Sequence, residues 1–285
     1  MRFFTADELA AFADGQHSEL YRVLGSHPDP AGCSFALWAP GARAVHVVGE
    51  FAPRGRALEK RREGVWTGRV QGAKAGQWYR YVVTTRSGEI EQRADPFAVS
   101  LRDPAAPEAI IGSPARRWRD GGWMRSRERR QGADRPLSIY EVHLGSWRRS
   151  ASGEFLGYRQ AARELAKYVS EMGFTHVEFL PLSEHPFYGS WGYQATGYFA
   201  PTARYGSPTD LMAAVETLHR AGIGVILDWV PSHFASDHHG LAQFAGQATY
   251  EHADRRKGFH PDWDSPVFNH ESGEVRSFLL SSARW

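Results

Sequence analysis

The sequence predicts two kinds of fold in succession, a β-sandwich in the first part of the chain and an α/β region with a parallel sheet in the second. Up to about Ile111, short runs of β-branched and aromatic residues alternate with turns, as they do in small sandwiches. From Leu137 the pattern becomes strand, helix, strand, helix, strand, which favours right-handed crossovers and parallel pairing. With 285 residues and 42% hydrophobic content, the chain is long enough for roughly two such domains.

Four stretches supply the strands expected of the sandwich, namely SFALWAP, AVHVVGEF, GVWTGRV and QWYRYVVTTRSGEIEQR. The last stretch is expected to hold two strands, because Ser87-Gly88 is a typical hairpin turn. We place the sandwich at residues 20–111, after an N-terminal extension of residues 1–19. Its tryptophans Trp38, Trp66 and Trp78 are expected to pack within and between strands rather than to form a glycan platform.

A basic segment, residues 112–136, separates the sandwich from the α/β region. It is rich in Arg and Gly and shows no helical period. An anion-binding patch and a solvated linker both fit that composition, and the absence of a helical stripe favours the linker.

Residues 137–285 are expected to begin with strands at SIYEVHL, HVEFLPL and VILDWV, joined by two helices. The second helix has the clearest start, because Ser207-Pro208-Thr209-Asp210 offers an N-cap, a proline at the first helical position and an acidic third residue. The first helix is expected to end near Gly173. Its expected buried face carries Ala161, Leu165, Tyr168, Val169 and Met172.

The last segment, EVRSFLLSSARW, also shows helical spacing, with Val275, Phe278 and Leu279 on one stripe. A sheet of only three parallel strands leaves an open edge and little surface to cover a further helix. We therefore expect this stripe to face water, and the region after Pro136 to be poorly stable on its own.

Composition excludes several classes of function. The net charge of +2 is too small for a dedicated nucleic-acid binder, and no stretch approaches the roughly 20 apolar residues of a membrane span. A single cysteine, Cys33, rules out an internal disulfide and favours a reducing compartment. The N-terminus does not resemble a signal peptide. We therefore expect a cytoplasmic protein with neither nucleic acid nor membrane as a partner.

Polar and aromatic side chains gather where the predicted strands end. Asp228 lies at the end of the third strand, and His233 follows in the next loop. The long loop after the second strand adds aromatic residues, namely Tyr188, Trp191, Tyr193 and Tyr198. The carboxyl ends of parallel strands form the functional edge of such sheets, and long loops there are usually functional. A carboxylate, an imidazole and exposed rings together predict a carbohydrate site, although each residue alone has a structural explanation.

Metals and cofactors are not expected. His233, His238 and His239 do not have the spacing of a helical or finger-type metal site. The chain also lacks a glycine-rich phosphate loop, a nucleophile elbow and a CxxC pair.

Three long motifs resemble the bacterial 1,4-α-glucan (glycogen) branching enzymes of the α-amylase superfamily. They are SIYEVHLGSWRR, GFTHVEFLPLSEHPFYGSWGYQATGYFAPTARYGSPTDL and VILDWVPSHF, in that order. The resemblance implies an N-terminal immunoglobulin-like, starch-module-type sandwich followed by the first part, about three βα units, of a (β/α)8 TIM barrel. It also implies a retaining reaction that cuts an α-1,4 link and forms an α-1,6 link, with an α-1,4-glucan as the partner.

The same resemblance assigns roles to single residues. Asp228 and His233 would grip the glucosyl unit at the cleavage point, and Tyr193, in WGYQ, would stack beneath that sugar. We expect Trp191 and Gln194 of the same motif to bind the substrate as well.

The chain departs from the family at two places. After VVGEF, Ala52-Pro53-Arg54 stands where most relatives have an Asn and a Trp, which weakens the case for glycan binding by the sandwich. The family's nucleophile and acid/base carboxylates would also lie beyond Trp285. Because a retaining mechanism needs both groups, we expect no catalytic residue within the chain and no activity from it alone.

Two alternatives remain open at this stage. One is another α-glucan-active relative, such as a maltooligosyltrehalose trehalohydrolase, although HLGSW and DWVPSHF favour branching. The other is a non-catalytic glucan-binding protein that uses the incomplete barrel as a scaffold.

Overall fold

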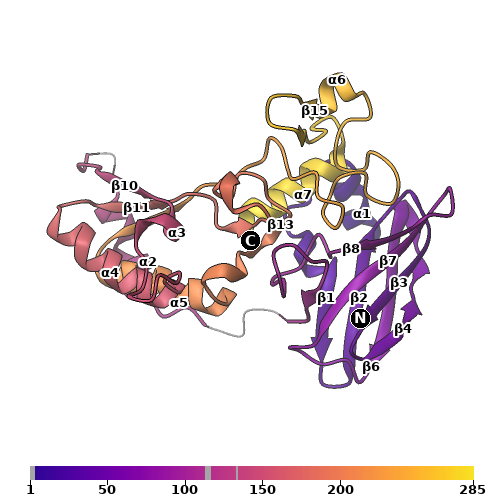
Figure 1. Cartoon of the computed structure of the whole chain (residues 1–285), viewed down its shortest axis with the longest axis horizontal. Coiled ribbons are helices and arrows are strands. Elements are labelled where there is room, and N and C mark those ends of the chain that lie inside the picture. Colours follow the sequence, from indigo (N-terminus) through magenta and orange to yellow (C-terminus); the bar gives the residue numbers. More distant parts are fainter. Residues whose placement is uncertain (1–3, 113–116, 133) are drawn as a thin grey trace. The chain divides into compact units, whose positions relative to one another are not determined.

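The computed structural model describes residues 4–112, 117–132 and 134–285, which fall into two compact units (Figure 1). Unit 1 comprises Met1–Ser113, Ser183–Ala200 and Val230–Trp285, and unit 2 comprises Pro114–Leu182 and Pro201–Trp229. Each unit has a hydrophobic core of its own. Within the described ranges, no helix is both long and apolar enough to cross a membrane.

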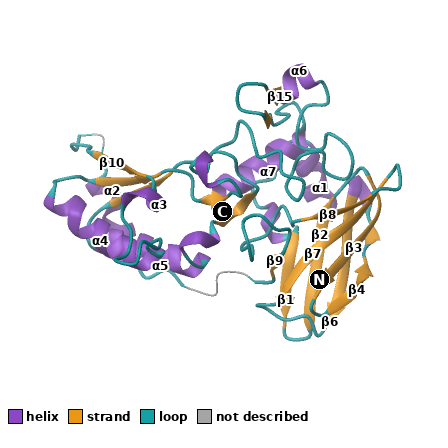
Figure 2. Cartoon of the chain, in the orientation of Figure 1, coloured by secondary structure: helices purple, strands orange, loops and turns teal. Residues whose placement is uncertain are grey.

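Unit 1 is built on the predicted immunoglobulin-like sandwich (Figure 2). One sheet has the strand order β1-β2-β6-β5, and the other has β4-β3-β7-β8 with β9 paired to β7. The two sheets share one core, in which the rings of Phe35 and Tyr79 lie 5.1 Å apart. The strands are β1 (Gly25–Asp29), β2 (Gly32–Trp38), β3 (Ala42–Gly49), β4 (Ala52–Ala57), β5 (Glu59–Lys60), β6 (Val65–Gln71), β7 (Trp78–Thr85), β8 (Ile90–Arg93) and β9 (Ala109–Ile110).

Local features of the sandwich agree with the sequence. The predicted hairpin joins β7 to β8, and Gly88 in its turn has a φ of 96°, which a side chain rarely tolerates. Trp38 and Trp66 are buried, as predicted. Short 3₁₀ turns precede β1 and β6, at Leu20–Arg22 and Arg62–Gly64.

The C-terminal helix α7 (Gly273–Arg284) corrects one prediction, because its apolar stripe is buried rather than exposed to water. Val275, Phe278 and Leu279 belong to the core of unit 1. The Phe278 ring lies 5.5 Å from that of Phe97 and 5.1 Å from that of Tyr250. The spacing identified the stripe correctly, but a stripe does not specify which element covers it.

Small residues of α7 bring it close to the N-terminal helix α1 (Ala6–Ala13). Ser277 Oγ accepts a hydrogen bond from the His17 amide, and Ser281 Oγ accepts one from the Leu20 amide. At Gly273, an added Cβ would lie 1.6 Å from the Ala13 carbonyl oxygen. The predicted N-terminal extension is therefore fixed to unit 1 through α7.

A buried carboxyl group, Asp95, lies at the centre of the sandwich core. It accepts hydrogen bonds from the Tyr79 hydroxyl (2.7 Å) and the Phe97 amide (2.8 Å). Burial raises the pKa of Asp95 to about 6, and these hydrogen bonds reduce the rise. Because the folded-state pKa lies above that of the unfolded chain, folding is favoured when Asp95 is protonated.

We predict that Asp95 makes unit 1 less stable as the pH rises from about 4 to about 6, by about 3 kcal/mol in total. The measurement is the free energy of urea unfolding from about pH 4 to about pH 8 for the chain and for Asp95→Asn. The difference between the two should change across this window and stay constant above it. A constant difference at every pH would show that folding does not change the pKa of Asp95.

Unit 2 contains the predicted parallel sheet, in the order β10-β11-β14. Its strands are β10 (Ile139–Val142), β11 (His176–Phe179) and β14 (Gly224–Leu227). Helices α4 (Tyr158–Glu171) and α5 (Pro208–Arg220) connect them. This order of strands and helices agrees with the first βα units of the (β/α)8 barrel that the resemblance implies.

The helix ends of unit 2 follow from local chemistry. Ser207 and Asp210 form the predicted capping box of α5, with Pro208 at the first helical position. The buried face of α4 includes Ala161, Leu165 and Val169, but Met172 is exposed, contrary to the prediction. Met172 is the C-cap of α4 and precedes Gly173. Because the helix ends there, its buried face does not extend to Met172.

The segment interpreted as an irregular linker contains helix α2 (Gly121–Arg130). One buried side chain, Trp123, anchors it, with its ring stacked 4.7 Å from that of His219 at the end of α5. A helix that buries one aromatic residue has no apolar stripe, which explains why periodicity missed it.

Candidate functional site

The long loop after β11 lies in unit 1 and folds tightly. It contains β12 (Ser183–Glu184), a 3₁₀ turn (Tyr188–Ser190) and β13 (Gly197–Pro201). Trp191 ends the 3₁₀ turn with a φ of 56°, a left-handed conformation that is costly for a bulky residue, and it is 56% exposed. Such strained residues cluster at binding and active sites.

The next loop brings His233 against the first. The amide of Ala235 donates to the Ala195 carbonyl (3.1 Å), which joins the two loops through their backbones. The His233 ring is buried and donates a hydrogen bond to the Tyr193 backbone. Burial lowers the pKa of His233, and the nearby His260 ring lowers it further, so the imidazole is neutral at pH 7.

The other ring nitrogen of His233, Nδ1, is buried and has no hydrogen-bond partner among the described residues. Buried polar atoms are almost always paired in folded proteins. A water molecule or a substrate hydroxyl is the kind of group that would satisfy such a nitrogen.

A short hairpin completes this part of unit 1. Strands β15 (Phe259–His260) and β16 (Ser265–Pro266) follow helix α6 (Arg255–Gly258), and the turn between them presents Trp263. The Trp263 ring stacks on His260 (4.1 Å, 8°) and lies 5.0 Å from the His233 ring. The backbone carbonyl oxygen of Trp263 accepts a hydrogen bond from Gln194 Nε2 (3.1 Å).

Asp228 belongs to unit 2, where it directly follows β14. Its amide donates to the Phe179 carbonyl at the end of the neighbouring strand β11 (3.0 Å). His143 follows β10 at the same end of the sheet, and burial together with Arg149 lowers its pKa. The carboxyl edge of the sheet therefore carries Asp228 and His143, as expected of a parallel α/β sheet.

The structure thus describes the predicted residues in two groups. Unit 1 brings together Tyr193, Gln194 and His233, with Trp191 in the same loop, while Asp228 lies at the sheet edge of unit 2. Tyr198, predicted to be an exposed ring, is instead buried, with its hydroxyl 2.9 Å from the His233 carbonyl oxygen. Tyr198 therefore supports the His233 loop from the core of unit 1 and does not offer an exposed ring to a ligand.

Sequence reasoning missed His260 and Trp263. The turn-forming residues around Trp263, in HPDWDSP, were the available signal, since a tryptophan inside a turn is expected at the surface. Its contact with His233 arises only from tertiary structure.

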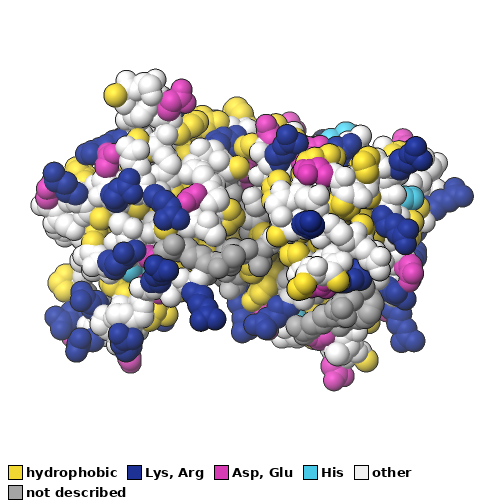
Figure 3. All heavy atoms as spheres, turned by 90° about the horizontal axis from the view of Figure 1, so that it is seen from below, with side chains coloured by type: hydrophobic (Ala, Val, Ile, Leu, Met, Phe, Trp, Pro, Cys, Tyr) yellow, Lys and Arg dark blue, Asp and Glu magenta, His cyan; other side chains and the backbone are white. Residues whose placement is uncertain are grey.

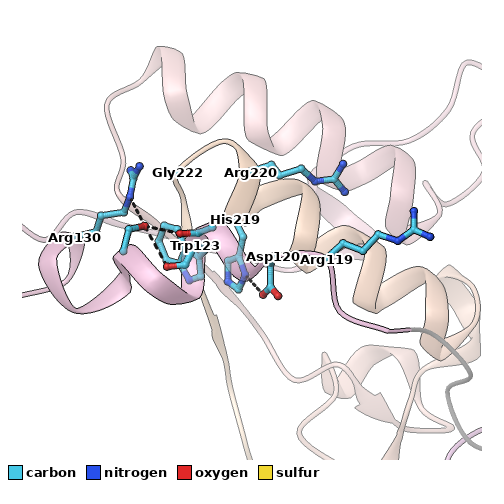
Figure 4. Close-up of a pocket in the computed structure, with 9 residues that line it drawn as sticks. Arg119, Asp120, Trp123, Arg130, His219, Arg220 and Gly222 are labelled. Atoms are coloured by element: carbon cyan, nitrogen blue, oxygen red, sulfur yellow. Dashed lines mark hydrogen bonds and ion pairs between the residues drawn. The ribbon is translucent and has the colours of Figure 1, made fainter.

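The basic segment forms a second candidate, a hollow of about 410 Å³ in unit 2 beside α2 and α5 (Figure 4). Figure 3 shows Lys and Arg side chains spread over both ends of the view, so they do not mark this hollow out. In the close-up, Asp120 bonds to His219 beside Trp123, Arg119 and Arg220 extend to one side, and Arg130 extends to the other.

The guanidinium groups of Arg220 and Arg130 have structural partners, and the three arginines do not converge on one point in the close-up. Arg220 Nε donates to the Glu216 carbonyl (3.1 Å), and Arg130 Nε donates to Ser126 Oγ (3.0 Å). Both arginines lie in the last turn of a helix, where the helix dipole favours cations. The hollow is therefore explained by helix packing and is a poor candidate for an anion site.

The described residues contain no cluster of three or more His, Cys, Asp or Glu side chains that would hold a metal ion.

Two family models match separate parts of the chain. Residues 23–98 match Carbohydrate-binding module 48 (Isoamylase N-terminal domain), within the sandwich. Residues 148–277 match Alpha amylase, catalytic domain.

Curated relatives match almost the whole chain. The 1,4-alpha-glucan branching enzyme GlgB of Aromatoleum aromaticum is 55% identical over 97% of the chain. The GlgB enzymes of Albidiferax ferrireducens and Aquifex aeolicus are 50% and 49% identical, each over 96%. The chain spans 44–45% of the length of these three relatives.

Solved structures share the fold at low identity. A pullulanase from Paenibacillus barengoltzii superposes with a TM-score of 0.75 at 19% identity, over 100% of this chain and 48% of that one. A putative alpha amylase from Salmonella typhimurium gives 0.73 at 24%, over 91% and 40%. These two likenesses show the fold alone. The branching enzymes that align with nearly the whole chain, together with the two family models, show that the chain belongs to the 1,4-alpha-glucan branching enzyme family and carries a module 48 sandwich followed by part of an α-amylase-type catalytic domain.

Proposed function

We propose that this chain supplies the glucan-gripping part of a 1,4-α-glucan branching enzyme, which cuts an α-1,4 link and remakes it as an α-1,6 link. In this proposal residues 20–111 are the module 48 domain, 112–136 join it to the catalytic domain, and 137–285 begin that domain. The observation that carries the proposal is the fixed position of the His233 ring on the Tyr193 backbone, in two loops whose sequences match the family's motifs.

Each predicted residue has a specific role in binding the glucan. Tyr193 stacks against the sugar ring, because the face of a pyranose is apolar and aromatic rings provide a flat apolar surface. His233, neutral at pH 7, exchanges hydrogen bonds with hydroxyl groups. Asp228, at the carboxyl edge of the unit 2 sheet, accepts hydrogen bonds from sugar hydroxyl groups.

Trp191 and Gln194 shape the same loop. The strained backbone at Trp191 holds an exposed indole in a fixed position, which suits contact with an adjacent sugar of the glucan. Gln194 is tied to the Trp263 carbonyl, so its amide positions the loop and presents its remaining polar atom to the substrate.

The chemical step needs two carboxyl groups about 5–5.5 Å apart, one as nucleophile and one as acid/base. The resemblance places neither of them within residues 1–285. We therefore assign this chain binding and positioning of the glucan, and no bond-breaking group.

The experiment is to join residues 1–285 to the part of the Aromatoleum aromaticum GlgB that this chain does not cover. We expect the chimera to form α-1,6 links in amylose. The chain alone, at the same concentration, should form none, and turnover by it above a no-protein control would contradict the assignment of roles.

A further inference from the structure

Trp263 combines exposure with an unusually fixed position. It is 53% exposed, although a tryptophan is one of the most costly side chains to leave in water. Stacking on His260 and the ring contact with His233 restrict its orientation, and Gln194 holds its backbone. A surface tryptophan held in this way by three neighbours is preorganised for contact with a ligand.

The hairpin that carries Trp263 is attached to the loop of His233. The Phe234 amide donates to the Pro266 carbonyl (3.1 Å), and the Phe268 amide donates to the Ser232 carbonyl (3.0 Å). Asp264, the residue after Trp263, has a φ of 47°, so the turn holds the indole in place by a strained backbone. These backbone hydrogen bonds therefore hold the Trp263 ring beside the His233 ring.

The surroundings of Trp263 favour a sugar over an apolar partner. Asp262 and Asp264 flank it in the chain and are both exposed. Two carboxylates beside an indole would disfavour a lipid surface or an apolar protein patch. They suit a ligand whose ring faces are apolar and whose rim carries hydroxyl groups.

We propose that Trp263 is a glucan-binding residue, whose indole stacks on a glucosyl unit adjoining the one gripped by His233. This rests on the proposed function, since it requires the same loops to bind an α-1,4-glucan. It assigns the β15–β16 hairpin a substrate-positioning role that the family motifs quoted above do not include.

The test uses the 285-residue chain labelled with 5-fluorotryptophan and observed by ¹⁹F NMR, so that each of its ten tryptophans gives a resonance. Trp263→Phe assigns one resonance by its loss. Trp118 is a matched control, because it is also 53% exposed but lies in unit 2, in the segment before α2. Maltoheptaose should shift the Trp263 resonance and leave that of Trp118 unchanged.

A binding measurement adds a second readout. Trp263→Ala should weaken maltoheptaose binding about tenfold, which corresponds to about 1.4 kcal/mol, whereas Trp263→Phe should retain most of the affinity because its ring still stacks. Maltoheptaose binding that shifts other tryptophans but not Trp263 would overturn this inference and leave the proposed function standing. Absence of any binding would overturn both.

Discussion

His233→Ala is expected to lower kcat for branching about 100- to 1,000-fold in the chimera of residues 1–285 with the remaining part of the Aromatoleum aromaticum GlgB. The magnitude follows from the loss of one fixed polar contact to the reacting sugar, as for a single oxyanion-hole donor. The fold should be affected much less, because the backbone bonds around Phe234 and Ala235 that join the loops do not involve the ring. The measurement is kcat on amylose together with the melting temperature.

His238→Ala is the control for this prediction. His238 is an exposed histidine five residues further along the same segment, and no contact among the described residues places it in the group around Tyr193. We expect its kcat to equal that of the unmodified chimera. An unchanged kcat in His233→Ala, or a loss matched by unfolding, would show that His233 is structural in this chain.

Arg93→Ala is expected to lower the free energy of unfolding of unit 1 by about 3–5 kcal/mol, which is large against a typical total of about 5–15 kcal/mol. Arg93 is fully buried, and its guanidinium donates to the carbonyl oxygens of Gly240 (3.1 Å), Ala242 (2.8 Å) and Gln243 (2.9 Å). It also pairs with Glu91 at 3.0 Å. Its loss would leave these oxygens buried without donors.

The matched control is Arg69→Ala in the same sandwich. Arg69 contacts both carboxylate oxygens of Asp29 at 2.7 Å, but the two side chains are 31% and 42% exposed. We expect this change to cost much less than Arg93→Ala, because solvent screens an exposed ion pair. Urea unfolding of both variants measures the difference, and equal costs would show that burial does not set the strength of the Arg93 contacts.

The sequence predicted those parts of the fold that depend on local chemistry. The capping box at Ser207 and Asp210, the hairpin at Ser87-Gly88 and the parallel order of β10, β11 and β14 were all confirmed. Each is determined by residues close together in the chain or by a connection rule with few exceptions.

The parts that depend on tertiary packing were not predictable. Periodicity found the stripe of α7 but not its partner, because Phe97 and Tyr250 are distant in sequence. Helix α2 escaped notice because a single stacked pair, Trp123 with His219, fixes it.

The candidate site shows the same division. Asp228, His233 and Tyr193 could be proposed because loops after parallel strands usually carry function. Trp263 and His260 could not, because only the tertiary hydrogen bonds between the β15–β16 hairpin and the His233 loop bring them to His233. The roles of all five remain proposals.

The most direct test of the central claim is linkage analysis of amylose after incubation with the unmodified chimera, by the anomeric ¹H NMR signals of α-1,6 and α-1,4 glucosyl units. The account predicts new α-1,6 signals, sensitive to a debranching enzyme, with the total number of glucosidic links preserved. A folded chimera that gave no α-1,6 signal, or only shortened linear chains, while the intact GlgB parent branched the same amylose, would contradict it.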